Sequence, residues 1–472
     1  MIAIESKKNK YTYNVYHLVK AFFPGEEISQ KVDESLESLT AVRFSDGDDF
    51  VLMPGELEEN ADEKWEVTRR LYRYLSERTG RKLAWGMLTG VRPTKLIMQK
   101  IEAGMDREEI IRSFQEEDFV SEEKAVLAYE TALREHELLS KLDCEKGFSL
   151  YVGIPFCPSV CSYCSFSSSP LDAWKDRVDL YLDALMKEIR ALGERMRGRR
   201  PDTIYIGGGT PTTLEPHQLR RLLEGISESF DINGLLEFTI EAGRPDSITE
   251  EKLQVIREYP VTRISINPQT MQQKTLDLVG RRHTVEDVEN AFRLARRMGF
   301  DNINMDLIAG LPGENAEDMR DTLARIEALC PDSLTVHALA IKRAARLGQE
   351  GRTADLGSEI ERMIDEAAAS AGRMGLTPYY LYRQKNIAGN FENVGYAEVD
   401  KAGIYNILIM EEKQTILGAG AGASTKIYSP EPIRMANGKE SNLIRIENVK
   451  NITEYISRID EMIQRKCSME ML

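Results

Sequence analysis

The stretch SLYVGIPFCPSVCSYCSF, residues 149–166, joins a short apolar strand to a loop with three cysteines. Cys157, Cys161 and Cys164 follow the spacing Cys-x3-Cys-x2-Cys. A structural zinc site needs four ligands, usually from two Cys-x2-Cys knuckles, and this sequence has no second knuckle. Three thiolates on one loop instead suit a [4Fe–4S] cluster that keeps one iron open for a ligand from outside the protein.

Outward from this loop, short apolar strands alternate with amphipathic helices. The strands are expected at 149–154, 203–208, 237–242, 262–267, 302–308 and 333–339. The helices between them are expected at 173–196, 216–229, 249–258, 284–298 and 315–328. This alternation predicts βαβ units and a parallel sheet, either open or curved into a partial barrel. In a barrel, the chemistry belongs at the C-terminal ends of the strands.

The flanking regions differ in pattern from this central part. In the N-terminal region we expect strands over 10–20 and 39–53 and helices over 63–80 and 121–141. Between these helices, residues 85–101 are expected to form a loop that runs into another helix. In the C-terminal region we expect helices near 358–374 and 452–466 and a glycine-rich segment at 418–424. The domains predicted on this basis are an N-terminal α+β accessory module, 1–143, a central domain, 144–340, and a substrate-covering region, 341–472.

The charge balance limits the partners. The chain has 472 residues, with 62 Lys and Arg against 77 Asp and Glu, for a net charge of −15. This argues against a partner such as nucleic acid or an anionic membrane, although a local basic pocket remains compatible with it. No apolar stretch approaches the roughly 20 residues of a membrane span, and the N-terminus lacks the apolar core of a secretory signal. We therefore expect a soluble cytoplasmic protein.

The cysteine loop, with YVGIPF before it and GGGTP at 207–211, resembles the signature of radical S-adenosylmethionine (SAM) enzymes. In that superfamily a partial barrel holds the cluster, and the amino and carboxylate groups of SAM chelate the open iron. The resemblance therefore implies an α/β fold, namely a partial (β/α)6 radical-SAM barrel with an N-terminal α+β module and a mixed α/β C-terminal region. It implies a [4Fe–4S] cluster on Cys157, Cys161 and Cys164, with SAM beside it.

The resemblance also places SAM contacts at successive strand ends. It implies that Glu241 contacts SAM, that Arg281 binds the SAM carboxylate and that Asp306 binds the ribose. Arg282 is adjacent to Arg281, so that assignment could shift by one residue. Glu241 could instead be a solvated surface residue, and Ala338 an ordinary core residue. The complete expected set is Tyr151, Tyr163, Gly208, Gly209, Thr210, Glu241, Gln269, Arg281, Asp306, Ala338 and Ser424.

The motifs YxxIPFCxxxCxYC, GGGTPT, EAGRPD and NxDLIxGLPGE resemble the oxygen-independent coproporphyrinogen III dehydrogenase (oxidase) family. The N-terminal segment WGMLTGVRPTKL, residues 85–96, resembles a Gram-positive branch. The resemblance implies that cleaved SAM yields a 5′-deoxyadenosyl radical, which abstracts a β-hydrogen from a propionate. Loss of CO2 and an electron then leaves a vinyl group, and two such steps give protoporphyrinogen IX in heme biosynthesis.

The same resemblance implies the partners. It implies two SAM molecules, a tetrapyrrole substrate and an electron donor such as flavodoxin or ferredoxin. The substrate carries four carboxylates, so its pocket should be basic. Arg343, Arg383 and Lys385 in the C-terminal part are the candidates for binding the propionates, and the alternative is that they are solvated surface charges.

Two departures from the family pattern leave other reactions open. The best-studied type has a His where this chain has Gly153, and a fourth Cys where it has Phe166. We therefore assign no catalytic residue. The alternatives are a heme-acting radical-SAM methyltransferase and a heme-binding chaperone without decarboxylase activity. The chaperone motif His-Asn-x-x-Tyr-Trp is not matched at 392–397, where both the His and the Trp are absent.

Overall fold

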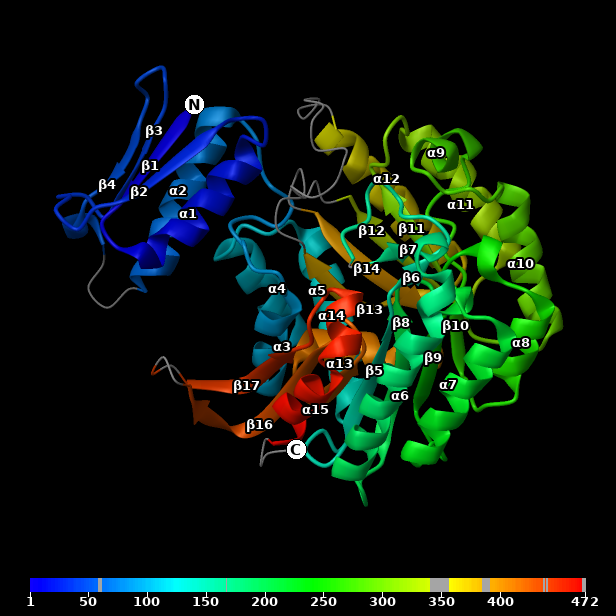
Figure 1. Cartoon of the computed structure of the whole chain (residues 1–472). Helices are drawn as coiled ribbons and strands as arrows, with labels where there is room; N and C mark the ends of the chain where they lie inside the picture. Colours follow the sequence, from blue (N-terminus) through cyan, green and yellow to red (C-terminus); the bar gives the residue numbers. More distant parts are fainter. Residues whose placement is uncertain are drawn as a thin grey trace.

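The computed structural model describes residues 1–57, 62–166, 168–339, 356–383, 391–435, 438 and 440–468. Its centre is a sheet of 11 strands (Figure 1). The six strands in the middle of this sheet are parallel and adjacent. They are β5 (Phe148–Ile154), β8 (Pro201–Gly208), β9 (Glu237–Glu241), β10 (Arg263–Ser265), β11 (Ile303–Ala309) and β12 (Ser333–Ala338). All six predicted strands are confirmed.

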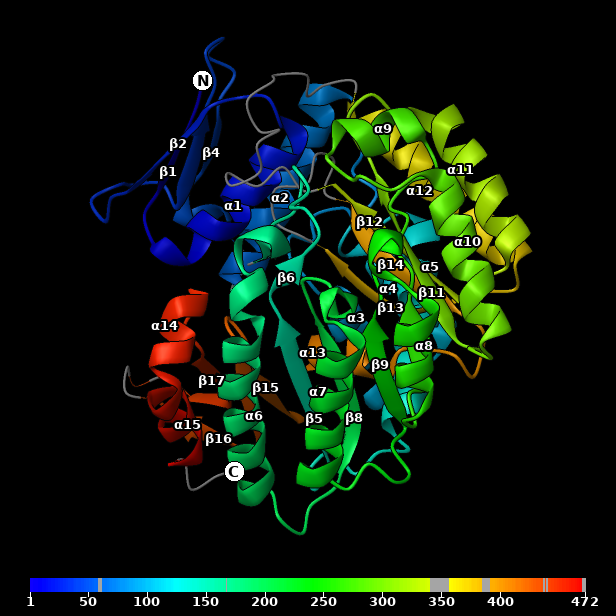
Figure 2. The ribbon, with the colours of Figure 1, turned by 45° about the vertical axis from the view of Figure 1, so that its right-hand side comes forward.

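Helices cover one face of these strands (Figure 2). They are α6 (Val178–Arg195), α7 (Pro216–Ser229), α8 (Glu250–Arg257), α10 (Val285–Arg297) and α11 (Ala316–Leu329), which confirms the predicted helices. Their starts follow from the sequence. Thr284 and Asn315 accept hydrogen bonds from the first-turn amides of α10 and α11, as N-cap residues do. A further short helix, α9 (Gln273–Leu278), was not predicted.

Alternate residues of each central strand face opposite sides of the sheet. In β5, Leu150, Val152 and Ile154 are fully buried members of the main hydrophobic core that the covering helices share. The intervening positions form a polar inner face. Its members include Ser149, Tyr151, Tyr205, Glu237, Thr239, Glu241, Arg263, Asn304, Asp306 and His337. The polar chemistry of the sheet is therefore collected on the face opposite the helices.

The C-terminal region extends this sheet at both edges. β13 (Thr377–Arg383) and β14 (Glu392–Ala397) continue it antiparallel beyond β12. β15 (Thr415–Ala419) lies parallel to β5, and β16 (Ser424–Arg434) and β17 (Glu440–Glu447) follow it. In the described residues the pairing order ends at β13 and β17. The sheet therefore stays open, as expected of a partial barrel.

The helices of the C-terminal region occupy three places. α12 (Leu356–Arg373) packs on α11 and was predicted. α13 (Ile404–Glu411), which was not predicted, packs against β8 and β13, and its Tyr405 stacks on Tyr205 with ring centres 4.5 Å apart. The predicted last helix is two helices, α14 (Ile452–Ser457) and α15 (Ile459–Cys467), and both pack on α6.

The N-terminal region contains a sheet of its own. β1 (Ile2–Ser6), β2 (Ile28–Val32), β3 (Thr40–Arg43) and β4 (Phe50–Leu52) pair in the order β2-β1-β3-β4. The strand expected over 10–20 was wrong, because this segment is the helix α1 (Asn9–Phe22). Its buried residues Tyr11, Val15, Leu18, Val19 and Phe22 recur at the spacing of one helical face.

Four more helices follow in this region. α2 (Glu63–Thr79) ends at Gly80, as predicted, with Gly80 at φ 66°. α3 (Thr94–Glu102) and α5 (Glu122–Leu139) were predicted, whereas α4 (Arg107–Glu116) was not. α5 packs on β13 of the central sheet. The domain boundaries at 143 and 340 stay predictions. In the described part of the chain, no helix combines the length and apolarity that crossing a membrane requires.

Candidate functional site

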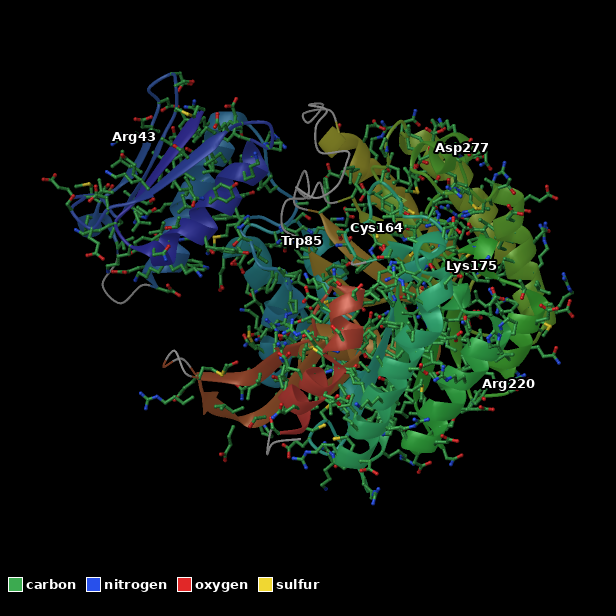
Figure 3. All side chains as sticks on the ribbon, in the orientation of Figure 1. Arg43, Trp85, Cys164, Lys175, Arg220 and Asp277 are labelled. Atoms are coloured by element: carbon green, nitrogen blue, oxygen red, sulfur yellow. The ribbon has the colours of Figure 1, made fainter. Side chains whose placement is uncertain are left out.

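The cysteine loop leaves the C-terminal end of β5 and is hydrogen-bonded to its surroundings. The backbone N–H of Thr210 donates to Phe156 O at 2.7 Å, and that of Ser162 donates to Val279 O at 3.1 Å. Cys157, Cys161 and Cys164 are half-buried free thiols. Burial and the neighbouring cysteines raise the pKa of the Cys157 thiol. The loop is thus held against the segments that follow β8 and α9, and Figure 3 labels Cys164 on it.

The spacing of the three cysteines fits a cluster. Within the described ranges, no three His, Cys, Asp or Glu side chains form a group that could hold a single metal ion. A [4Fe–4S] cluster does not need such a group, because each thiolate binds a different iron. Two side chains already hydrogen-bond to the sulfurs: the Thr210 hydroxyl lies 3.5 Å from Cys157 Sγ, and a guanidinium N–H of Arg244 lies 3.7 Å from Cys161 Sγ.

The backbone of the glycine-rich loop lies very close to other parts of the chain. A Cβ on Gly209 would lie 2.5 Å from the Phe156 carbonyl oxygen, and a Cβ on Gly207 would lie 3.0 Å from the carboxyl carbon of Glu241. Gly208 has φ +106°, in the region that favours glycine. The glycines therefore bring the cysteine loop and Glu241 together.

Two carboxyl groups lie on the inner face, Glu241 as the last residue of β9 and Asp306 within β11. Glu241 accepts a hydrogen bond from the Tyr205 hydroxyl at 2.5 Å, and burial raises its pKa to about 7. Asp306 accepts one from the Asn304 amide at 2.7 Å, and its Oδ2 lies 4.0 Å from Nε2 of His337. Glu241 is half-buried and bonded to Tyr205, so it is not a solvated surface residue. The pair suits a ligand with an amino group and a sugar diol.

Arg281, which was expected to bind the SAM carboxylate, also connects parts of the protein. Its guanidinium is buried and donates to the Tyr163 hydroxyl at 3.1 Å, Gly243 O at 3.1 Å and Asn267 O at 2.6 Å. It therefore fastens the cysteine loop to the segments after β9 and β10. Two buried polar atoms here, Arg281 Nε and Asn267 Oδ1, have no partner among the described residues. Both are available to the polar groups of a ligand, so the site fits SAM.

The remaining expected SAM residues lie in different settings. Gln269, at φ 69°, is fixed by backbone bonds to Asp306 and Ile308 of β11. Ala338 is buried in the main core, and its N–H donates to Asn393 Oδ1 at 3.0 Å. Ser424 lies at the start of β16, two strands away from β5, and its hydroxyl donates to Glu447 at 2.7 Å. Tyr151 stacks on Tyr205 with ring centres 6.3 Å apart.

Of the residues expected to bind propionates, Arg343 and Lys385 lie outside the described residues. Arg383 is 1 % exposed, so it is not a solvated surface charge. Its guanidinium donates to Leu88 O at 2.7 Å and lies 5.3 Å from the ring centre of Trp85. Burial lowers its pKa to about 10. Arg383 therefore joins β13 to the N-terminal segment around Trp85, which Figure 3 labels.

Several side chains of the site were missed from the sequence. Arg244 lies in the quoted motif EAGRPD, so its position next to Glu241 was a usable signal. Tyr205 and His337 occupy inner-face positions that strand alternation alone indicates. Tyr405 had no such signal, because it reaches the inner face from a helix about two hundred residues after Tyr205 in sequence.

Comparison with known proteins agrees with this geometry. Residues 151–326 match the radical SAM superfamily. The chain is 41 % identical over 398 residues, 83 % of its length and 78 % of the relative, to the oxygen-independent coproporphyrinogen-III oxidase-like protein HemZ of Bacillus subtilis. It is 36 % identical over 210 residues to the heme chaperone HemW of the same organism, covering 43 % of the chain and 54 % of HemW.

Among solved structures, the chain resembles the radical SAM coproporphyrinogen III oxidase HemN from Escherichia coli. The TM-score is 0.54 and the identity 24 %, covering 70 % of this chain and 73 % of HemN, so this likeness supports the fold alone. Radical SAM enzymes use a [4Fe–4S] cluster and SAM, and the cysteine loop and strand ends described above fit both. On the similarity across most of its length, the chain belongs to the family of HemZ, within the radical SAM oxidoreductases of porphyrin metabolism.

Proposed function

We propose that this enzyme oxidatively decarboxylates two propionates of coproporphyrinogen III to vinyl groups, giving protoporphyrinogen IX. The observation that carries the proposal is the likeness to HemZ over 83 % of the chain, which extends well beyond the matched superfamily segment 151–326.

We assign the cluster to Cys157, Cys161 and Cys164, and SAM to the strand ends beside them. When bound, these groups supply an electron and a radical that removes a hydrogen atom from the substrate. Glu241 and Asp306 would hold the amino group and the ribose of SAM. Arg281 holds the cysteine loop in place through Tyr163. The stacked rings of Tyr151, Tyr205 and Tyr405 lie on the inner face, where the Tyr205 hydroxyl donates to Glu241.

The substrate side follows from charge. Each propionate must be bound as a carboxylate, which cations from the C-terminal part would provide, and Arg343 and Lys385 remain the candidates for this. The substrate loses one hydrogen atom, CO2 and one electron per propionate, so an electron acceptor is needed as well as a donor. A flavodoxin or ferredoxin would supply the electron that starts each turnover. A second SAM would be bounded by Tyr151, Tyr163, Gly208–Thr210 and Ser424.

The deciding experiment is anaerobic turnover with a reductant, SAM and either coproporphyrinogen III or, in a parallel reaction, heme, followed by mass analysis. The expected products have lost CO2 and two hydrogen atoms at one and then at two propionates. A linear or methylated tetrapyrrole formed from heme, with no vinyl product, would refute the decarboxylation and favour a heme-acting enzyme. Heme that binds and is recovered unchanged would favour a carrier.

The ligand assignment has its own test. Replacing a cluster cysteine by Ala should abolish the cluster and SAM cleavage. Replacing Cys144, Cys330 or Cys467 should leave an iron content of about four per chain. Loss of iron on replacing Cys330 would show that a ligand has been misassigned.

One observation favours the second candidate, a heme-acting or heme-carrying protein. Gly153 offers no side chain, and Phe166, on the cysteine loop, is 74 % exposed. Neither position supplies the proton donor or the thiol of the best-studied decarboxylase type, while an exposed aromatic ring suits stacking on a flat macrocycle. The same turnover experiment distinguishes the two candidates.

A further inference from the structure

A second buried arginine lies behind the cysteine loop. Arg244, directly after β9, is 3 % exposed. Its Nε and one terminal nitrogen bind both oxygens of Asp246, at 2.9 and 2.7 Å. Nδ1 of the fully buried His283 lies 3.6 Å from the same carboxylate. This bidentate pairing fixes the plane of the guanidinium, because a planar fork matches a carboxylate in one geometry.

The other terminal nitrogen of Arg244 points at the cysteine loop. It lies 3.2 Å from both the carbonyl and the hydroxyl oxygen of Ser159, and 3.7 Å from Cys161 Sγ. The Ser159 hydroxyl in turn donates to Gly280 O at 2.9 Å. Among the three cysteines of the described structure, Cys161 is the one that accepts a hydrogen bond from a charged group; Cys157 has the neutral hydroxyl of Thr210 at 3.5 Å.

We propose that Arg244 sets the reduction potential of the cluster through its hydrogen bond to Cys161. The reduced cluster carries one more negative charge than the oxidised one, so a fixed N–H donor from a cation stabilises the reduced form more. Hydrogen bonds to the sulfurs and the local charge are known controls of cluster potential. Asp246 acts as the positioning residue that keeps the donor aimed at the sulfur. Arg281 lies near the same sulfur but gives its terminal N–H groups to Tyr163, Gly243 and Asn267.

This inference rests on the assignment of the cluster to the three cysteines and is independent of the tetrapyrrole that is processed. Absence of a vinyl product from the wild type would refute the proposed decarboxylation and leave the role of Arg244 standing. The role of Arg244 is instead tested by the midpoint potential of the cluster.

The test is a redox titration of the anaerobically purified holoenzyme, followed by electron paramagnetic resonance, after the iron content has been measured. Arg244→Gln should retain its iron and show a lower midpoint potential. Losing one charged hydrogen bond should shift the ratio of reduced to oxidised cluster about tenfold, which for one electron is about 59 mV. Arg220→Gln is the matched control, because Arg220 pairs with Glu258 and lies on the outer surface away from Cys164 (Figure 3). Its potential should equal that of the wild type.

An unchanged potential in Arg244→Gln at full iron content would overturn the proposal. If the Gln variant binds less iron, the comparison passes to Arg244→Lys, which keeps the charge but not the fork. That variant should show a smaller decrease in potential, and a wild-type value at full iron content would overturn the proposal. Loss of iron from both variants, with the circular dichroism of the fold retained, would overturn it in favour of a role in holding the loop.

Discussion

Replacing Arg281 by Met tests how the cysteine loop is held in place. Arg281 is 4 % exposed, and its terminal nitrogens make three hydrogen bonds, to the Tyr163 hydroxyl and to the carbonyls of Gly243 and Asn267. Met retains much of the apolar volume but none of the donors. Each buried acceptor left without its donor costs about 1–3 kcal/mol. At the lower limit, the three together destabilise the loop by about 3 kcal/mol.

Hydrogen–deuterium exchange of the anaerobically prepared protein measures this destabilisation directly. The Ser162 amide, bonded to Val279 O at 3.1 Å, reports opening of the loop. A loss of about 3 kcal/mol corresponds to exchange about 100-fold faster at this amide, since each 1.36 kcal/mol is a factor of ten. We also expect a lower iron content, because the thiolates are no longer held together. The neighbouring Arg282 is exposed, so Arg282→Met is the control and should leave both values unchanged.

One result would refute this reasoning. If Arg281→Met keeps its full iron content and exchanges at Ser162 within about threefold of the wild type, the three hydrogen bonds do not hold the loop. A loss of SAM affinity alone in that variant would then support the role that the sequence resemblance implied, a contact with the SAM carboxylate. Loss of iron together with loss of SAM affinity would support the holding of the loop alone, because SAM then lacks the iron that it chelates.

Three other charged side chains can be tested: Glu241, Lys466 and Asp306. Burial raises the pKa of Glu241 from its ordinary value of 4.5 to about 7. The unfolded chain therefore loses this proton at lower pH than the folded one, and the unliganded protein becomes less stable as the pH rises from 4.5 toward 7. The N–H donors of the SAM amino group bond more strongly to the carboxylate than to the neutral acid. Calorimetry should therefore show binding about tenfold tighter at pH 8 than at pH 6, and Glu241→Gln should remove that dependence. Lys466 donates to Glu188 at 2.5 Å, and both side chains are fully buried. Lys466→Met should therefore lower the free energy of unfolding in urea by about 3 kcal/mol. Lys187 is exposed, so the control Lys187→Met should lower it by less than about 1 kcal/mol. Asp306→Ala should weaken SAM binding about tenfold and leave the iron content unchanged. A loss of iron of about tenfold in the same variant would contradict the assignment of Asp306 to SAM.

Much of the central fold could be predicted from local pattern. The six central strands β5, β8, β9, β10, β11 and β12 and the helices α6, α7, α8, α10 and α11 follow from apolar runs of strand length that alternate with helical periods. Thr284 and Asn315 mark helix starts by their own chemistry. The error over residues 10–20 has a local cause as well. Tyr11, Tyr13 and Val15 alternate as in a strand, and the helical period shows only when Leu18 and Phe22 are included.

The sequence by itself determined the parts of this protein that lie close together along the chain: the cysteine loop, the strand-end motifs and the likeness to radical SAM enzymes. Only the tertiary structure decided which side chains meet. Arg281 reaches Tyr163, 118 positions away, and Lys466 reaches Glu188, 278 positions away. β15 joins β5 across more than 260 residues, and Arg383 is buried under the segment at Trp85 rather than exposed. Such contacts depend on how the sheet orders its strands, and hydrophobic periodicity carries no information about that order.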